Sequence, residues 1–213
     1  GGMESGTALA DVLTGTVNPS GKLTDTIAIN YEDYPSSQSF GGQSFNAYTE
    51  DIYVGYRYFE TFAPDRVLYP FGFGLSYTRF RLSSRAAVSG SQITVSTDVE
   101  NIGDEAGREV VQVYVDLPCG KLGNPKRVLA GFQKSHLLNP GQQETVEITF
   151  DLHDLASFDD TGASGAKFAF VLEPGSYCIQ AGTSIRDVNP VVCIVKQGME
   201  VVRQLHECNA VRP

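Results

Sequence analysis

The second half of the chain alternates apolar and polar residues with a period of two. Such alternation predicts β-strands, because successive side chains of a strand point to opposite faces. The positions that share one face in each of three such segments are Ile93, Val95, Thr97, Val99, Val111, Val113, Val115, Val146, Ile148 and Phe150. Tyr114 lies on the other face of its strand.

Further strand-like segments follow the same pattern. They are KRVLAGFQK, KFAFVLE, GSYCIQAGT and PVVCIVKQG, and turn sequences such as NIGDEAG, LNPGQ and EPGS separate them. About seven or eight short strands indicate a mainly β protein with an antiparallel β-sandwich, which we place at residues 76–195. The sequence has no tryptophan, which excludes the Cys-Trp-Cys arrangement of antibody domains. A fibronectin type III-like (immunoglobulin-like) sandwich is the better description.

The first 29 residues have a different pattern. From Glu4 to Thr14 apolar residues recur at helical spacing, and Gly15 stands where a left-handed cap would end a helix. A turn and a short strand from Leu23 to Ile29 follow. One helix and one strand cannot bury a core alone, so residues 1–29 are predicted to belong to a larger domain.

Residues 30–75 are rich in Tyr, Phe, Gly and Ser and show little periodicity. Linkers stay loose because their hydrophobicity is low, so this aromatic segment is predicted to be an extended arm pressed onto another surface. We expect residues 1–75 to be far less ordered in isolation than residues 76–195, because the arm would lack the surface on which it packs.

The last segment, residues 196–213, again shows helical spacing. Met199, Val202, Leu205 and Cys208 would share one face of a helix. The segment is therefore predicted to be a helical tail or linker.

Composition and charge exclude some partners. The chain has 213 residues, of which 41% are hydrophobic and 19% are charged, as in a globular protein. Its net charge of -9 argues against nucleic acid, because phosphate binding depends on clustered Lys and Arg. No apolar run approaches the roughly 20 residues of a membrane-spanning helix.

The four cysteines are Cys119, Cys178, Cys193 and Cys208. None has a second cysteine at the close spacing of a zinc site. Cys178 and Cys193 lie in apolar strand-like segments, so we expect buried free thiols, with a cross-strand disulfide as the alternative. His206 and Cys208 are too few ligands for a metal site, and no cofactor or metal is predicted.

The motifs alone predict no active site. Acid–base hydrolysis of sugars needs two carboxylates that face each other. The adjacent carboxylate pairs of the sequence are Glu50-Asp51, Asp104-Glu105 and Asp159-Asp160. Neighbours in an extended chain point to opposite faces, so we interpret all three pairs as solvated loop charges. The histidines His136, His153 and His206 lack a Ser or Cys nucleophile in a strained turn.

A family resemblance adds what the motifs do not. The chain contains, in order, GGMESGTALADVLTGTVNPSGKLTDTIA, YTEDIYVGYRYFE and VLYPFGFGLSYTRF. This series resembles the closing part of family 3 glycoside hydrolases, the β-glucosidases and β-xylosidases. The fibronectin type III-like domain of that family is similar to DVENIGDEAGREVVQVYV, PKRVLAGFQKSHLLNPGQQETVEITFDLHDL and EPGSYCIQAGTSIRD.

The resemblance implies that residues 1–29 end an α/β sandwich domain and that residues 30–75 cross from it to the β-sandwich. In this family the substrate pocket lies between that domain and a barrel. The nucleophile is a barrel aspartate, and the glutamate that acts as acid and base usually precedes this segment. Neither has a counterpart here, so we expect no catalytic residue in the chain.

Two residues are weak candidates for the rim of the substrate pocket. Glu4 resembles the glutamate of a Gly-Gln-Glu-type loop, with Met3 in place of the glutamine, and favourable charge at a helix N-terminus is its simpler role. Arg57, beside Tyr58 in GYRYF, could clamp a sugar hydroxyl. Such an arginine more often stacks and pairs to fix an arm in place, so we expect a structural role.

The resemblance implies a segment of a retaining β-glucosidase that hydrolyses terminal β-linked glucose without a metal. The segment is expected to be inactive alone and to stabilise the catalytic domains. Its partners would be the barrel, the rest of the α/β domain and the β-glucoside, and a homo-oligomer stays open. The alternative is a stand-alone carbohydrate-binding or protein-interaction module. We also expect the parent protein to continue beyond Pro213 into the barrel.

Overall fold

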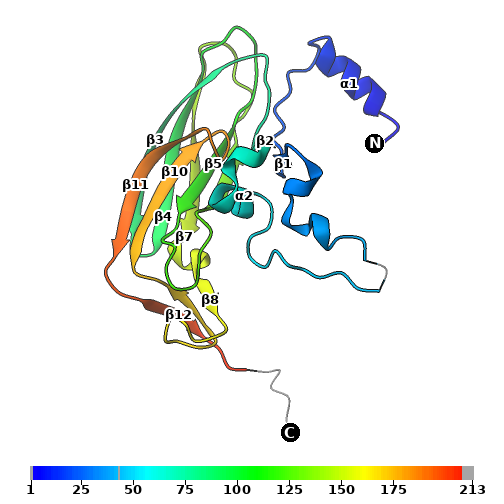
Figure 1. Cartoon of the computed structure of the whole chain (residues 1–213). Helices are drawn as coiled ribbons and strands as arrows, with labels where there is room; N and C mark the ends of the chain where they lie inside the picture. The colour runs from blue at the N-terminus through cyan, green and yellow to red at the C-terminus, as the bar shows by residue number, and fades with distance from the viewer. Residues whose placement is uncertain (1, 43, 208–213) are drawn as a thin grey trace.

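The structure is a computed structural model that describes residues 2–42 and 44–207. A β-sandwich forms the body of the molecule, an N-terminal arm lies along one side, and α1 stands away from the sandwich (Figure 1). The helices, with short 3₁₀ helices labelled η, are α1 (Ser5–Leu13), η1 (Tyr31–Asp33), η2 (Pro35–Gln38), α2 (Tyr56–Phe62), η3 (Pro64–Arg66) and η4 (Leu152–Leu155). The strands are β1 (Ile27–Ala28), β2 (Val67–Tyr69), β3 (Phe80–Ser89), β4 (Gln92–Asn101), β5 (Val110–Asp116), β6 (Arg127–Lys134), β7 (Gln143–Asp151), β8 (Ser157–Asp159), β9 (Ala169–Leu172), β10 (Gly175–Gly182), β11 (Val188–Lys196) and β12 (Glu200–Gln204).

Two antiparallel sheets enclose the core. One has the strand order β3-β4-β7 and the other the order β11-β10-β5-β6, while a small sheet β12-β9-β8 lies at one end of the body (Figure 1). Register follows the alternating pattern, since Val95 of β4 lies opposite Ile148 of β7. Each strand expected from the seven alternating segments is present. The predicted antiparallel sandwich is therefore confirmed.

The core consists of the residues that the period-two pattern placed on one face. All ten of them are buried, with exposed fractions of 8% or less. Burial of each large apolar side chain stabilises the fold by about 1.5–3 kcal/mol. Tyr114, on the opposite face of β5, is also fully buried. Strand β5 is thus covered on both faces, which alternation alone does not predict.

The arm is what covers the outer face of β5 and the edge of β6. Gln112 of β5 donates its side-chain amide to the carbonyl oxygens of Gly72 at 3.3 Å and Thr183 at 2.6 Å. The hydroxyl of Tyr56 accepts a hydrogen bond from the backbone amide of Leu129 at 3.1 Å. Gly72 has a φ of 79°, and a Cβ there would collide with Gln112. The surface on which the arm packs is therefore this same sandwich, and the expectation that the arm lacks its surface in this chain is wrong.

The arm is helical in part rather than extended. Phe59 of α2 is fully buried, and the rings of Tyr34 and Tyr58 meet it edge-on at centroid distances of 5.5 and 5.3 Å. Phe45 and Tyr48, in contrast, are 79% and 91% exposed. The prediction of buried arm aromatics holds for Phe59, and is wrong for Phe62 at the end of α2, which is 58% exposed, and for the middle of the arm.

The first 29 residues form the predicted helix but a shorter strand. Helix α1 ends where Gly15 adopts a φ of 78°. Strand β1 covers Ile27–Ala28 instead of Leu23 to Ile29, because its only partner in the two-stranded sheet is the three-residue β2. No residue of α1 is buried.

A strand replaces the predicted helical tail. Strand β12 pairs antiparallel with β9, with Val201 opposite Val171. The edge of β9 offers unpaired backbone groups, whereas a helix this short is marginal in water. A register shift after Val201 turns Val202 toward the core, so the spacing that suggested a helix also fits a bulged strand. Cys208 lies outside the described residues.

Cys178 and Cys193 form a disulfide, so the prediction of free thiols is wrong for this pair. They lie directly opposite each other on β10 and β11, with a Cα–Cα distance of 4.1 Å. Sequence alone could not reveal this register. Closing a loop between residues 15 apart contributes about 3 kcal/mol in the chain-entropy account. Cys119 is a free, exposed thiol.

Replacing Tyr56 by Phe is expected to lower the free energy of unfolding by about 1 kcal/mol, because the amide of Leu129 loses its acceptor. Urea unfolding measures this change. Tyr48→Phe is the matched control, since its ring is 91% exposed and its loss of a hydroxyl is expected to leave the midpoint unchanged. Equal midpoints for Tyr56→Phe and the parent chain would contradict docking of the arm through this bond.

Candidate functional site

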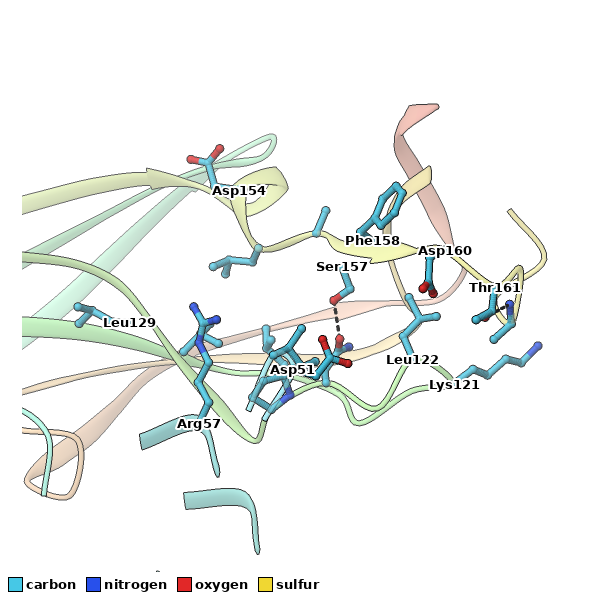
Figure 2. Close-up of a pocket in the computed structure, with 18 residues that line it drawn as sticks. Asp51, Arg57, Lys121, Leu122, Leu129, Asp154, Ser157, Phe158, Asp160 and Thr161 are labelled. Atoms are coloured by element: carbon cyan, nitrogen blue, oxygen red, sulfur yellow. Dashed lines mark hydrogen bonds between the residues drawn. The ribbon is translucent and has the colours of Figure 1, made fainter. Parts of the chain in front are cut away.

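A cleft of about 550 Å³ lies between the arm and the sandwich (Figure 2). Three segments line it: residues 51–57 of the arm, the 117–129 segment that leads from β5 into β6, and residues 154–163 around β8. The apolar part of its lining includes Leu117, Leu122, Val128, Leu129 and Leu155. The sequence places these segments far apart, and the docked arm brings residues 51–57 to the surface that the other two form.

A buried carboxylate fixes the loop that follows β5. Glu173 is 3% exposed, and it accepts hydrogen bonds from the backbone amides of Lys121 at 2.6 Å and Leu122 at 3.2 Å. The side-chain amide of Asn124 donates to the carbonyl oxygen of Pro118 at 2.9 Å. Since these buried polar groups are satisfied, this wall of the cleft is preformed.

Side-chain bonds join the loop to the other two walls. The hydroxyl of Ser157 donates to the side-chain oxygen of Asn124 at 2.5 Å (Figure 2). On the arm side, the hydroxyl of Tyr53 donates to the carbonyl oxygen of Gly123. The three walls therefore form one connected unit.

Asp159 anchors the end of the third wall. Its buried carboxylate accepts backbone amide hydrogen bonds from Gly162 at 2.6 Å and Ser164 at 2.7 Å, and the Ser164 hydroxyl donates to it at 2.6 Å. Burial opposes ionisation, but the bonds from Ser164, Gly162 and Ala163 outweigh it and hold the pKa of Asp159 well below its usual range. The interpretation of this residue as a solvated loop charge is wrong.

Charged side chains line the cleft without pairing. They are Asp51, Arg57, Lys121, Asp154 and Asp160. Within residues 2–42 and 44–207, none of these five side chains forms a hydrogen bond or an ion pair. Figure 2 shows Arg57 reaching up from α2 between Leu129 and Asp51, with Asp160 on the far side and Asp154 directed away.

The two predicted rim residues lie in different places. Glu4 is the exposed N-cap position of α1, makes no side-chain cap bond and does not line the cleft. Arg57 lines the cleft, but its guanidinium pairs with no described residue, so the interpretation that it fixes the arm by pairing is wrong. Tyr58 does stack, against Phe59 and Phe62. A pocket-rim role in substrate binding stays a prediction for both residues.

Sequence reasoning missed most of the cleft. Glu173 stands in EPGS, which it treated as a turn, and Asn124 and Ser157 carry no local motif. The one available signal was the presence of polar residues beside strand-like apolar runs. Only the fold shows that these residues meet.

Two of the histidines, His136 and His153, are engaged with carboxylates. His136 lies 2.7 Å from Glu144, and His153 lies 3.3 Å from Asp151 and 3.0 Å from Glu200. The described part of the chain has no group of three or more His, Cys, Asp or Glu that could hold a metal ion. None of its helices is both long enough and apolar enough to span a membrane.

Comparison with protein-family models assigns both halves of the chain. Residues 1–77 match the glycosyl hydrolase family 3 C-terminal domain, and residues 109–185 match the fibronectin type III-like domain. The chain belongs to glycoside hydrolase family 3. The cleft lies where these two matched regions meet, since residues 51–57 fall in the first and residues 117–163 in the second.

Relatives of this family 3 chain are β-glucosidases. A β-glucosidase of Ruminococcus albus is 45% identical over 210 residues, which are 99% of this chain and 22% of the relative. β-Glucosidase A of Butyrivibrio fibrisolvens is 48% identical over 206 residues, which are 88% of this chain and 25% of the relative. The chain spans about a quarter of the length of these relatives.

Solved β-glucosidases share the fold of this family 3 chain. The structure of a β-glucosidase from Paenibacillus barengoltzii has 46% identity and a TM-score of 0.89, covering 95% of this chain and 23% of that one. β-Glucosidase 3B from Thermotoga neapolitana, solved with α-D-glucose, has 40% identity and a TM-score of 0.83, covering 93% and 27%.

Asp159→Asn is expected to lower the melting temperature at neutral pH. The pKa of Asp159 is lower in the folded than in the unfolded chain, so its stabilisation is complete above the unfolded value of about 4 and is lost as the pH falls below it. The difference in melting temperature between the parent chain and the variant is therefore expected to shrink on acidification. Asp160→Asn, at the exposed neighbour, is the control and is expected to show no such pH dependence. A pH-independent difference for Asp159→Asn would contradict this account.

Proposed function

We propose that this family 3 chain is a non-catalytic segment of a retaining β-glucosidase. In the whole enzyme, terminal β-linked glucose is hydrolysed with retention, and this segment stabilises the catalytic domains. The observation that carries the proposal is an uncovered apolar surface at the N-terminal end, on a chain whose sandwich is otherwise complete.

That surface belongs to α1 and the small β1-β2 sheet. Its members and their exposed fractions are Met3 100%, Leu9 59%, Leu13 72%, Val17 49%, Ile29 52% and Leu68 55%. Exposed apolar side chains that recur along one part of the chain indicate an interaction site. Each side chain covered there would contribute about 1.5–3 kcal/mol, which is enough in sum to hold a domain in place. The remainder of an α/β domain, with the barrel beyond it, is the partner that this surface suits.

The β-glucosidase activity is inferred from the relatives, which carry that name at 38–48% identity over most of this chain. The family resemblance places the nucleophile and the acid–base glutamate outside this segment. We therefore infer that the reacting groups belong to the other domains of the enzyme. The segment contributes packing surface to them and takes no part in proton transfer.

A domain-exchange experiment tests the proposal. This chain replaces the corresponding segment of the Ruminococcus albus β-glucosidase, to which it is 45% identical. The chimera is expected to release p-nitrophenol from p-nitrophenyl β-glucoside, because the packing surfaces are retained. The isolated chain is expected to release none.

Two variants of the chimera test whether its activity depends on the uncovered apolar surface. Leu9→Asp with Leu13→Asp in the chimera is expected to abolish activity by charging the uncovered surface. Leu137→Asp changes a leucine that is 53% exposed on the sandwich and is expected to leave activity unchanged. Hydrolysis by the isolated chain, or full activity of the charged chimera, would contradict the proposal.

A further inference from the structure

The cleft between the arm and the sandwich combines a rigid frame with unused charges. Its walls are held by Glu173, Ser157 and Asp159 through satisfied, partly buried bonds. Its five charged lining residues have no partner among the described residues.

The balance of charge narrows the kind of ligand. Asp154 is directed away from the cleft (Figure 2), which leaves two carboxylates, Asp51 and Asp160, and two cations, Arg57 and Lys121, among its lining residues. A phosphate or other anion would meet as many carboxylates as cations, and the described residues offer no metal-binding group of three. The cleft therefore suits a neutral ligand that can both donate and accept hydrogen bonds.

The positions of these groups suit a sugar ring. Arg57 presents guanidinium donors from the arm side, while Asp51 and Asp160 present only acceptors (Figure 2). The apolar lining of the cleft includes Leu122, which Figure 2 shows beside Asp51 and Asp160. Vicinal hydroxyls bind planar charged groups, and the C–H face of a sugar packs on an apolar or aromatic surface. Binding pockets in general combine an apolar lining with a few convergent polar groups.

We propose that this cleft binds a neutral saccharide, held by Arg57 on one side and Asp160 on the other. The choice of a β-linked glucose oligomer as the ligand rests on the proposed function. The site would let this segment hold a glucan chain as well as brace the catalytic domains.

A peptide is the less favoured occupant. Peptides commonly add a strand to an exposed sheet edge. The edge at the cleft is β8, which has three residues and is cross-linked through Ser157 to Asn124. A three-residue edge strand that is already bonded to a neighbouring loop offers few backbone groups with which a peptide strand could pair.

Titration of the ¹⁵N-labelled 213-residue chain with cellotriose, followed by amide chemical shifts, tests the proposal. Saturable shifts are expected in residues 51–57, 121–124 and 157–161. Arg57→Ala is expected to weaken binding about tenfold or more, because hydrogen bonds to a charged donor are lost. Asp160→Asn, which keeps the size of the side chain, is expected to weaken it as well.

Arg85→Ala is the matched control, since Arg85 is exposed but pairs with Asp98 at 3.0 Å on the outer sheet face. The dissociation constant of Arg85→Ala for cellotriose is expected to equal that of the parent chain. The dispersion of the amide signals in each spectrum shows whether that variant is folded. The proposal is overturned by the absence of saturable shifts, by shifts confined to the exposed arm around Phe45 and Tyr48, or by unchanged binding in folded Arg57→Ala. The proposal is also overturned if inorganic phosphate, or an unrelated peptide added in place of cellotriose, causes amide shifts of the same size. Because no hydrolysis is measured, failure here is separate from failure of the chimera.

Discussion

The side-chain amide of Gln112 connects three parts of the molecule. It sits on the outer face of β5, fully inside the protein, and bonds the carbonyl oxygens of Gly72 in the arm and Thr183 in the loop after β10. Its oxygen accepts the hydroxyl of Tyr114 at 2.5 Å. Desolvation raises the pKa of Tyr114 far above its usual range, so this hydroxyl stays protonated and acts as a donor. A buried amide with all these partners is stable only while the arm stays in place.

The docked arm around α2 is bonded to the sandwich, whereas α1 is not. Around α2 the arm satisfies an edge amide of β6 through Tyr56 and forms an ion pair between Glu60 and Arg186 at 2.8 Å. It also builds one wall of the cleft. Before η1, by contrast, the apolar side chains of α1 face solvent. The chain thus carries a sandwich with its docked arm, together with exposed apolar side chains for which we propose the rest of a family 3 enzyme as the partner.

Much of the sandwich could be predicted, because residues that alternate with a period of two identify β4, β5 and β7 as strands and show which face of each is buried. The pairing of strands that are distant in the sequence could not be predicted in this way. The Cys178–Cys193 bridge depends on the register of β10 against β11, and β12 depends on an open edge of β9. Local spacing of Met199, Val202 and Leu205 fits a helix as well as a bulged strand, so only the partner decides.

The candidate site was harder to predict than the fold. Arg57 was recognised from GYRYF, but the groups that frame it, Glu173 and Asn124, are separated from it by more than 60 positions in the printed sequence. Asp159 looked like one of several acidic loop pairs, yet its carboxylate is enclosed by the amides that follow it. Burial and satisfaction of polar groups are tertiary properties, and a single sequence without its fold does not display them.

Amide hydrogen exchange of the whole chain, resolved by residue, tests the central claim that the arm belongs to the sandwich and α1 does not. The account predicts strong protection at Gly72, which donates to Leu23 at 2.8 Å, and at Ile185, which donates to Phe71 at 3.1 Å. It predicts rapid exchange throughout α1, in which no residue is buried. Rapid exchange at Gly72 and Ile185, with protection confined to the strands from β3 onward, would contradict it.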